Sequence, residues 1–126
     1  MRFKQLEVWQ RSYQLTLAVY KAVKPCKDYS LKNQIQRCAV SVPSNIAEGA
    51  ERKGRKEFIH FLFIAKGSCG EMATQLMLAR DLNYLSEQVA NELISESEDI
   101  INMLGGLIRF QSQKLGEDEA PYEVTG

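Results

Sequence analysis

The side chains of this 126-residue chain that are best suited to binding chemistry are four cations within five residues: Arg52, Lys53, Arg55 and Lys56. Flexible cations at a helix junction suit contacts with nucleic-acid phosphates, which position a protein without reading base sequence. The alternative is a solvated connector that binds nothing. Arg37 would enlarge the patch if it faced the same side. The run is therefore a candidate nucleic-acid-binding site.

A line of polar residues leads up to this run. Residues three or four apart lie on one face of a helix, and this spacing joins Arg37, Ser41, Asn45, Glu48 and Arg52. Ser68 and Glu71 would meet the line from a neighbouring helix. The line is either a ligand-binding surface or an internal ladder between two helices, and we favour the structural role.

Pro43 lies inside the same predicted helix. Proline lacks the backbone donor that would bond the carbonyl of Ala39, so a kink is expected there. Ser41, Ser44 or Asn45 would satisfy that carbonyl or brace the bend.

The residues that enzymatic or metal chemistry requires are missing. His60 is the only histidine, and no nucleophile-elbow motif accompanies it. The three cysteines have no C-x-x-C spacing, so we expect buried, reduced thiols at Cys26, Cys38 and Cys69. Di-metal bundles take a Glu-x-x-His motif from each of two helices, which the carboxylates of Glu92, Glu96 and Asp99 cannot supply alone. We predict no enzyme, no cofactor and no metal site.

Gly67 and Gly70 superficially match the G-x-x-G loop with which KH domains clamp nucleic acid. A KH fold needs strands, and no segment here predicts one. An apolar seam runs from Phe58 to Ala79 straight through these glycines. We expect the glycines to allow close helix approach instead.

Apolar residues recur at spacings of three and four in four segments, which predicts four helices. The first has a core stripe of Leu6, Trp9, Tyr13, Thr16, Tyr20 and Val23, and stops at Pro25. The second has an N-cap at Ser30 and a stripe from Leu31 to Ile46. The third carries the seam from Phe58 to Ala79 with a second stripe from Phe61 to Leu82. The fourth opens at Ser86 and continues beyond Leu107.

These helices predict an all-α, up-down antiparallel four-helix bundle over residues 1–115, with the second helix kinked at Pro43. Residues 116–126 are acidic and aperiodic, which predicts a disordered tail. No apolar run approaches the ~20 residues of a membrane helix, and no targeting segment is visible. We therefore expect a cytoplasmic protein with no membrane partner.

Charge and surface patterns point to association. Residues 1–66 carry 13 Lys/Arg and 5 Asp/Glu, whereas residues 67–126 carry 3 and 11, so the net charge of zero hides two halves of +8 and −8. Such segregation serves an anionic partner or self-association. Val8, Leu15, Val19 and Ala22 lie off the core stripe of the first helix, which predicts a homo-oligomer.

Four segments of the chain resemble the four-helix-bundle family of the 23S ribosomal RNA intervening-sequence proteins. The matching segments are Leu6-Glu7-Val8-Trp9-Gln10, Gln34-Ile35-x-Arg37, Val42-Pro43-x-Asn45-Ile46-Ala47-Glu48-Gly49 and Phe58-x-x-Phe61-Leu62-x-Ile64-Ala65-x-Gly67-Ser68. The resemblance implies a ring of five bundles, hence a homopentamer. Some family members are encoded within insertions in ribosomal RNA genes. A related bundle, the accessory variability protein of diversity-generating retroelements, works beside a reverse transcriptase and binds nucleic acid.

The expected function is therefore that of a non-enzymatic, oligomeric accessory protein that binds RNA or DNA through the basic junction. A neutral chain departs from the high pI usual for dedicated RNA binders. The alternative is a scaffold that recruits a protein partner and has no nucleic-acid role.

Overall fold

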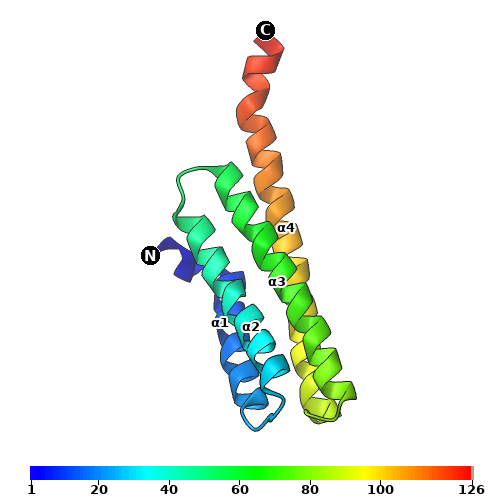
Figure 1. Cartoon of the computed structure of the whole chain (residues 1–126). Coiled ribbons are helices and arrows are strands. Elements are labelled where there is room, and N and C mark those ends of the chain that lie inside the picture. Colours follow the sequence, from blue (N-terminus) through cyan, green and yellow to red (C-terminus); the bar gives the residue numbers. More distant parts are fainter. Residues whose placement is uncertain (126) are drawn as a thin grey trace.

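The computed structural model describes the backbone of residues 1–125 and the side chains of residues 1–118. A short 3-10 helix, η1 (Arg2–Gln5), precedes four α-helices: α1 (Glu7–Val23), α2 (Tyr29–Glu51), α3 (Arg55–Asp81) and α4 (Glu87–Thr125) (Figure 1). These described residues contain no strand. The all-α class predicted from the sequence is confirmed.

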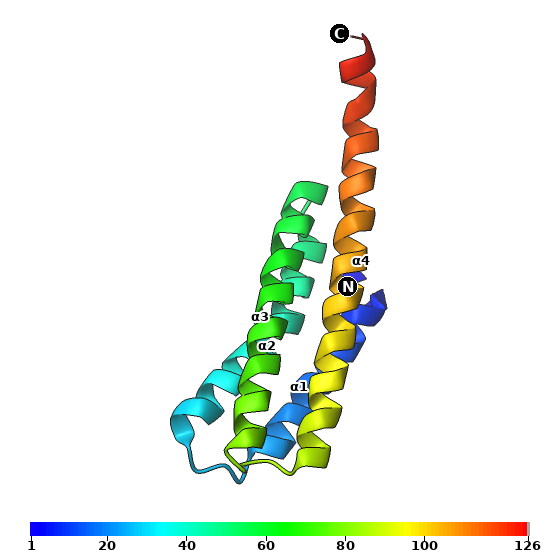
Figure 2. The same ribbon diagram turned by 90° about the vertical axis from the view of Figure 1, so that its right-hand side faces the viewer.

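The helices run up and down in chain order. The α1–α2 and α3–α4 turns lie at one end of the molecule, and the α2–α3 junction lies at the other (Figures 1 and 2). Helix α1 packs against α2 and α4, and α3 packs against the same two helices. The Tyr84 hydroxyl donates to Asp28 Oδ2 over 3.1 Å and ties the two turns together. The up-down four-helix bundle is confirmed.

Local capping explains where the helices begin. The Asp28 carboxylate accepts a hydrogen bond from the Leu31 amide at 3.1 Å, so Asp28, and not the predicted Ser30, is the N-cap of α2. The Ser86 hydroxyl accepts from the Val89 amide at 3.2 Å, as expected at the start of α4. Asn83 closes α3 with a left-handed backbone at φ 64°, a conformation that asparagine tolerates.

The core confirms the predicted seam of α3. Leu62, Ala65, Cys69, Met72, Leu76 and Ala79 are all buried, and they face a row on α4 that includes Ile100 and Leu104. Buried residues from all four helices pack together into a single hydrophobic core.

The predicted core face of α1 is wrong at Tyr13 and Tyr20 and correct at Val23. The buried residues are Val8, Ser12, Leu15, Val19 and Val23, whereas Tyr13 and Tyr20 are 45% and 41% exposed. Both stripes satisfy helical spacing. The branched and linear aliphatic side chains take the interior, and the tyrosines keep their hydroxyls near water. The apolar surface left on α1 is thus its aromatic stripe.

Pro43 lies inside α2 without ending it. The carbonyl oxygen of Ala39, which loses its helical donor, lies 3.0 Å from Thr16 Oγ1 of α1. That hydroxyl is also 2.8 Å from the Ser12 carbonyl oxygen and can donate to either. The sequence had indicated Ser41, Ser44 or Asn45 as the partner of this carbonyl. That prediction is wrong, because the partner is Thr16 of α1. The kink at Pro43 stays a prediction.

The C-terminal segment continues the last helix, and the disorder predicted for residues 116–126 stays a prediction. Helix α4 continues to Thr125 and extends beyond the junction end of α3 (Figure 1). Two ion pairs support its continuation, one from Lys114 to Glu117 at 3.4 Å and one from Arg55 to Asp118 at 3.2 Å. Gly126 lies outside the described residues.

Across the described residues, each helix is too short or too polar to span a lipid bilayer.

Candidate nucleic-acid interface

The basic run forms the turn between α2 and α3 and lines a hollow. This junction hollow has a volume of about 270 Å³. Its charged lining consists of Arg2, Arg52, Lys53 and Arg55, and Gln111 of α4 and Phe58 of α3 complete one side. Among the residues whose side chains are described, no carboxylate belongs to the lining. Three separate stretches of chain thus converge on one cationic depression.

Arg52 is held in place from two sides. Its guanidinium donates to Glu48 Oε1 at 2.6 and 3.1 Å, and it lies over the Phe61 ring at 5.3 Å from the centroid. The ion pair is about half exposed, so its contribution to stability is small. Its main effect is to orient the guanidinium, at the cost of partly neutralising it.

Arg55 is positioned by the last helix. Its Nη1 donates to Gln111 Oε1 at 2.6 Å and its Nε to Asp118 Oδ2 at 3.2 Å. Lys53 and Lys56 are exposed beside it. The structure therefore brings four of the predicted site residues together at one end of the bundle.

Arg37 is not brought to this site. It lies on α2 fifteen residues before Arg52, which corresponds to about 22 Å along the helix, and it is exposed there. It does not line the junction hollow.

Gly49 sets the geometry of the junction. A Cβ at this position would lie 2.8 Å from Phe61 Cβ and 3.1 Å from Phe58 Cδ1, so only glycine allows α2 and α3 to approach this closely. Gly67 and Gly70 have nothing within 4 Å of a built Cβ. The expectation that those two glycines permit close packing is therefore wrong. They lie inside the continuous helix α3, which also rules out a KH-type loop.

The polar line connects α2 to α3. The hydroxyls of Ser41 and Ser68 lie 2.9 Å apart across the two helices, and Asn45 Nδ2 donates to the Ser41 carbonyl and hydroxyl at 2.8 and 2.9 Å. Cys38 Sγ lies 3.9 Å from Glu71 Oε2. Because these polar groups bond to one another inside the bundle, the contacts favour the structural role over ligand binding.

Sequence reasoning missed two arginines. Arg2 lines the junction hollow although it is fifty residues away from the basic run, and no periodic pattern marks it.

The second missed arginine, Arg11 of α1, donates to both carboxylate oxygens of Glu96 on α4 and, at 3.3 Å, to Asp99. Hydrogen bonds to these carboxylates raise the pKa of the Arg11 guanidinium. Two of the carboxylates considered as metal ligands thus hold the α1–α4 contact together.

The cysteines are free thiols. Burial raises the pKa of Cys69 to about 12, and its Sγ donates to the Ser97 carbonyl at 3.4 Å. Burial also raises the pKa of Cys38, although Cys38 is only half-buried, whereas full burial had been predicted. A thiol with a raised pKa is a poor nucleophile at neutral pH. In the part of the chain with described side chains, no three His, Cys, Asp or Glu residues are arranged to hold a metal ion.

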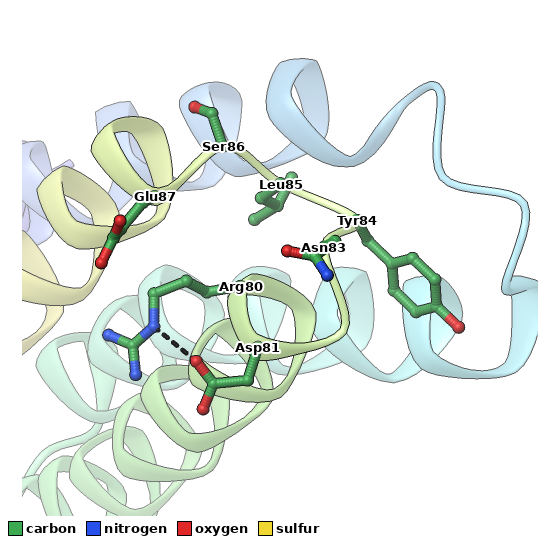
Figure 3. Close-up of a pocket in the computed structure, with 7 residues that line it drawn as sticks. All are labelled: Arg80, Asp81, Asn83, Tyr84, Leu85, Ser86 and Glu87. Carbon is green, nitrogen blue, oxygen red and sulfur yellow. Dashed lines mark hydrogen bonds and ion pairs between the residues drawn. The ribbon is translucent and has the colours of Figure 1, made fainter.

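A larger polar hollow of about 540 Å³ lies at the α3–α4 turn (Figure 3). Its only cation, Arg80, donates to Asp81 Oδ1 and to Asn91 Oδ1, each at 2.9 Å. Glu87 adds a second carboxylate to the lining. This hollow has no surplus of positive charge.

The fold and its surfaces define an antiparallel four-helix bundle with a cationic helix junction. Residues 4–106 match the family model of the 23S rRNA-intervening sequence protein. Because this match spans most of the chain, the protein belongs to that family.

A solved structure supports the fold assignment. The crystal structure of a protein of unknown function from the S23 ribosomal protein family of Bacteroides thetaiotaomicron superposes with a TM-score of 0.77. The two chains are 24% identical over 80% of this chain and 97% of the other. A comparison with curated proteins gave no match.

Proposed function

We propose that this protein is a non-enzymatic, oligomeric nucleic-acid-binding protein that contacts the phosphates of RNA or DNA through the junction hollow. The observation that carries the proposal is the convergence of Arg2, Arg52, Lys53 and Arg55 on one depression whose described lining contains no carboxylate. Arginine forks suit phosphate oxygens. Membership of a family named for an intervening sequence of ribosomal RNA agrees with this chemistry.

The geometry favours backbone contacts over base reading. The cations lie on a turn and at helix ends, and the lining holds few groups that would recognise a base edge. Binding through phosphates alone is insensitive to base sequence and falls steeply with salt.

The test compares the wild type with Arg52/Lys53/Arg55/Lys56→Gln on structured RNA and duplex DNA at about 50 and 200 mM salt. On duplex DNA, losing four phosphate contacts should lower the slope of log affinity against log salt by about three to four. A control, Lys4/Arg37/Lys66/Lys114→Gln, removes the same charge outside the hollow and should bind far better. Equal binding by the two variants would refute the junction site.

The second candidate is assembly into a scaffold for a protein partner. An apolar groove of about 360 Å³ runs between α1 and α2, lined by Phe3, Trp9, Tyr13, Leu17, Val40 and Pro43. Leu17 is 53% exposed and Val40 42% exposed, which is the kind of surface that association covers. The homopentamer implied by the family resemblance would use such surfaces. If nucleic acid does not bind, recruitment of a protein by this oligomer becomes the leading function.

A further inference from the structure

A second cationic hollow lies at the opposite end of the bundle from the junction. It has a volume of about 400 Å³ and lies between the last turns of α1 and the first turns of α2. Its lining consists of Tyr20, Lys21, Lys24, Lys32 and Gln36, with no carboxylate. We refer to it as the lysine–tyrosine hollow.

The charge around this hollow is less compensated than at the junction. Residues 20–36 contain four lysines and one aspartate, a net charge of +3. The one carboxylate, Asp28, accepts bonds from the Leu31 amide and the Tyr84 hydroxyl, each at 3.1 Å. It forms no ion pair with any of these lysines in the described structure, so their charge remains available to an anionic ligand.

One lysine of the four has a structural task. Lys32 Nζ donates to the Lys24 carbonyl at the end of α1 over 2.9 Å, which is the stabilising role expected of a cation at a helix C-terminus. The side chains of Lys21 and Lys24 are exposed, and their ammonium groups make no hydrogen bond or ion pair to any residue whose side chain the structure describes. Being three residues apart, they lie on one face of α1.

Aromatic rings accompany these cations. Tyr20 lines the hollow and is 41% exposed. Tyr29, at the start of α2, lies 5.8 Å from Lys32 Nζ and is 64% exposed. Sites for single-stranded nucleic acid combine lysines that follow the phosphates with aromatic rings on which unpaired bases stack. A duplex keeps its bases stacked on one another and offers no base face to such a ring.

We propose that the lysine–tyrosine hollow is a second nucleic-acid site, one that binds a single-stranded segment. Lys21 and Lys24 contact successive phosphates, and Tyr20 stacks on a base. The site is separate from the junction hollow, because Gln36 in its lining and Gly49 in the lining of the junction hollow are thirteen residues, or about 20 Å, apart along α2. One bundle would then hold a folded or duplex segment at one end and an unpaired segment at the other.

The experiment measures fluorescence anisotropy of a labelled oligouridine and of a blunt duplex at about 50 and 200 mM salt. The variants are Lys21→Gln/Lys24→Gln, Tyr20→Leu, the junction quadruple variant, and the matched control Lys4→Gln/Lys114→Gln. Lys32 is left unchanged because it closes the α1 terminus. Circular dichroism and sedimentation confirm that each variant keeps its fold and oligomer size.

We expect Lys21→Gln/Lys24→Gln to weaken oligouridine binding about tenfold and to lower its salt slope by about 1.4, since single strands release about 0.7 counterion per contact. Tyr20→Leu should weaken the same probe about fivefold with an unchanged slope. The control and the junction variant should retain most of the oligouridine affinity.

Two outcomes would refute the single-strand site and leave the proposal for the junction hollow unaffected. One is oligouridine binding by the lysine variant that equals the control. The other is a Tyr20→Leu variant that binds like the wild type, which would leave charge alone and no single-strand site. Conversely, loss of duplex binding in the junction variant with oligouridine binding intact would support both sites. Failure of the wild type to bind oligouridine, with duplex binding normal, would refute only this second site.

Discussion

The two ends of the bundle present cations in different ways. The junction end concentrates four cations in five residues, but residues 48–57 also contain three glutamates, which leaves a net charge of +1. Asp118 adds a further carboxylate against Arg55. The turn between α1 and α2 spreads its lysines over twelve residues, from Lys21 to Lys32, with only Asp28 among them. The denser run in sequence is therefore the more neutralised one in space.

The chemistry of the cations differs as well. The junction arginines are oriented by Glu48, Gln111 and Asp118, which pre-arranges their forks for phosphate oxygens. Lys21 and Lys24 are unconstrained, which suits the changing path of a flexible strand. The hollow at the α3–α4 turn is larger than either, yet its arginine is paired. Charge balance, and not volume, separates candidate binding surfaces from simple depressions.

The largest expected effect comes from disrupting the apolar groove that lies between the two ends. Leu17→Glu/Val40→Glu places two carboxylates on surfaces that would meet in an oligomer, and sedimentation should show a smaller species. A long structured RNA should then bind about a hundredfold more weakly, because linked sites lose avidity. A short probe that occupies one hollow should bind as before.

Phe63→Glu/Leu78→Glu provides the matched control for this variant, since Phe63 and Leu78 are 54% and 49% exposed on α3 and lie outside the groove. An unchanged oligomer in the groove variant would show that the apolar groove is not the oligomer interface, and a smaller oligomer with unaffected RNA affinity would show that both ends act within a single bundle.

The next largest effect is expected from a substitution that lowers stability and impairs only the junction end. In Gly49→Ala the new Cβ would meet Phe61 Cβ at 2.8 Å, and the helices must separate at a cost of about 1–3 kcal/mol of unfolding free energy. Urea unfolding measures this loss, and duplex binding at the junction should fall while oligouridine binding is kept.

Gly70→Ala is the control for this substitution. It has open space around it, so it should gain up to about 1 kcal/mol from the better helix propensity of alanine. A Gly49→Ala protein as stable as the Gly70→Ala protein would contradict the close approach of α2 and α3.

The smallest effect tests the charge comparison itself. Glu51→Gln/Glu57→Gln raises the net charge of residues 48–57 from +1 to +3, the value at the lysine–tyrosine hollow. Duplex affinity should rise about two- to fivefold at about 50 mM salt and the gain should shrink at higher salt, because exposed charges are screened. Anisotropy titrations follow the change, and oligouridine affinity should stay constant. A gain that persists in high salt would point to altered structure instead of charge.

Local sequence patterns were enough to predict the four helices and much of the core. The seam of α3 was readable because Leu62, Ala65, Cys69, Met72, Leu76 and Ala79 follow a single uninterrupted pattern. The start of α4 was readable because Ser86 has the side-chain chemistry of an N-cap. Spacing and local hydrogen bonding act within a few residues, so one chain is enough to reveal them.

Tertiary structure decided the rest. Helix α1 has two stripes with valid spacing, and only its place between α2 and α4 selects Val19 over Tyr20 for the interior. The partner of the Ala39 carbonyl is Thr16 and the third arginine of the junction hollow is Arg2, and both come from distant parts of the chain. The close contact of α2 with α3 is made at Gly49 and not at Gly67 or Gly70. Each of these depends on which helices become neighbours, and local periodicity carries no information about that choice.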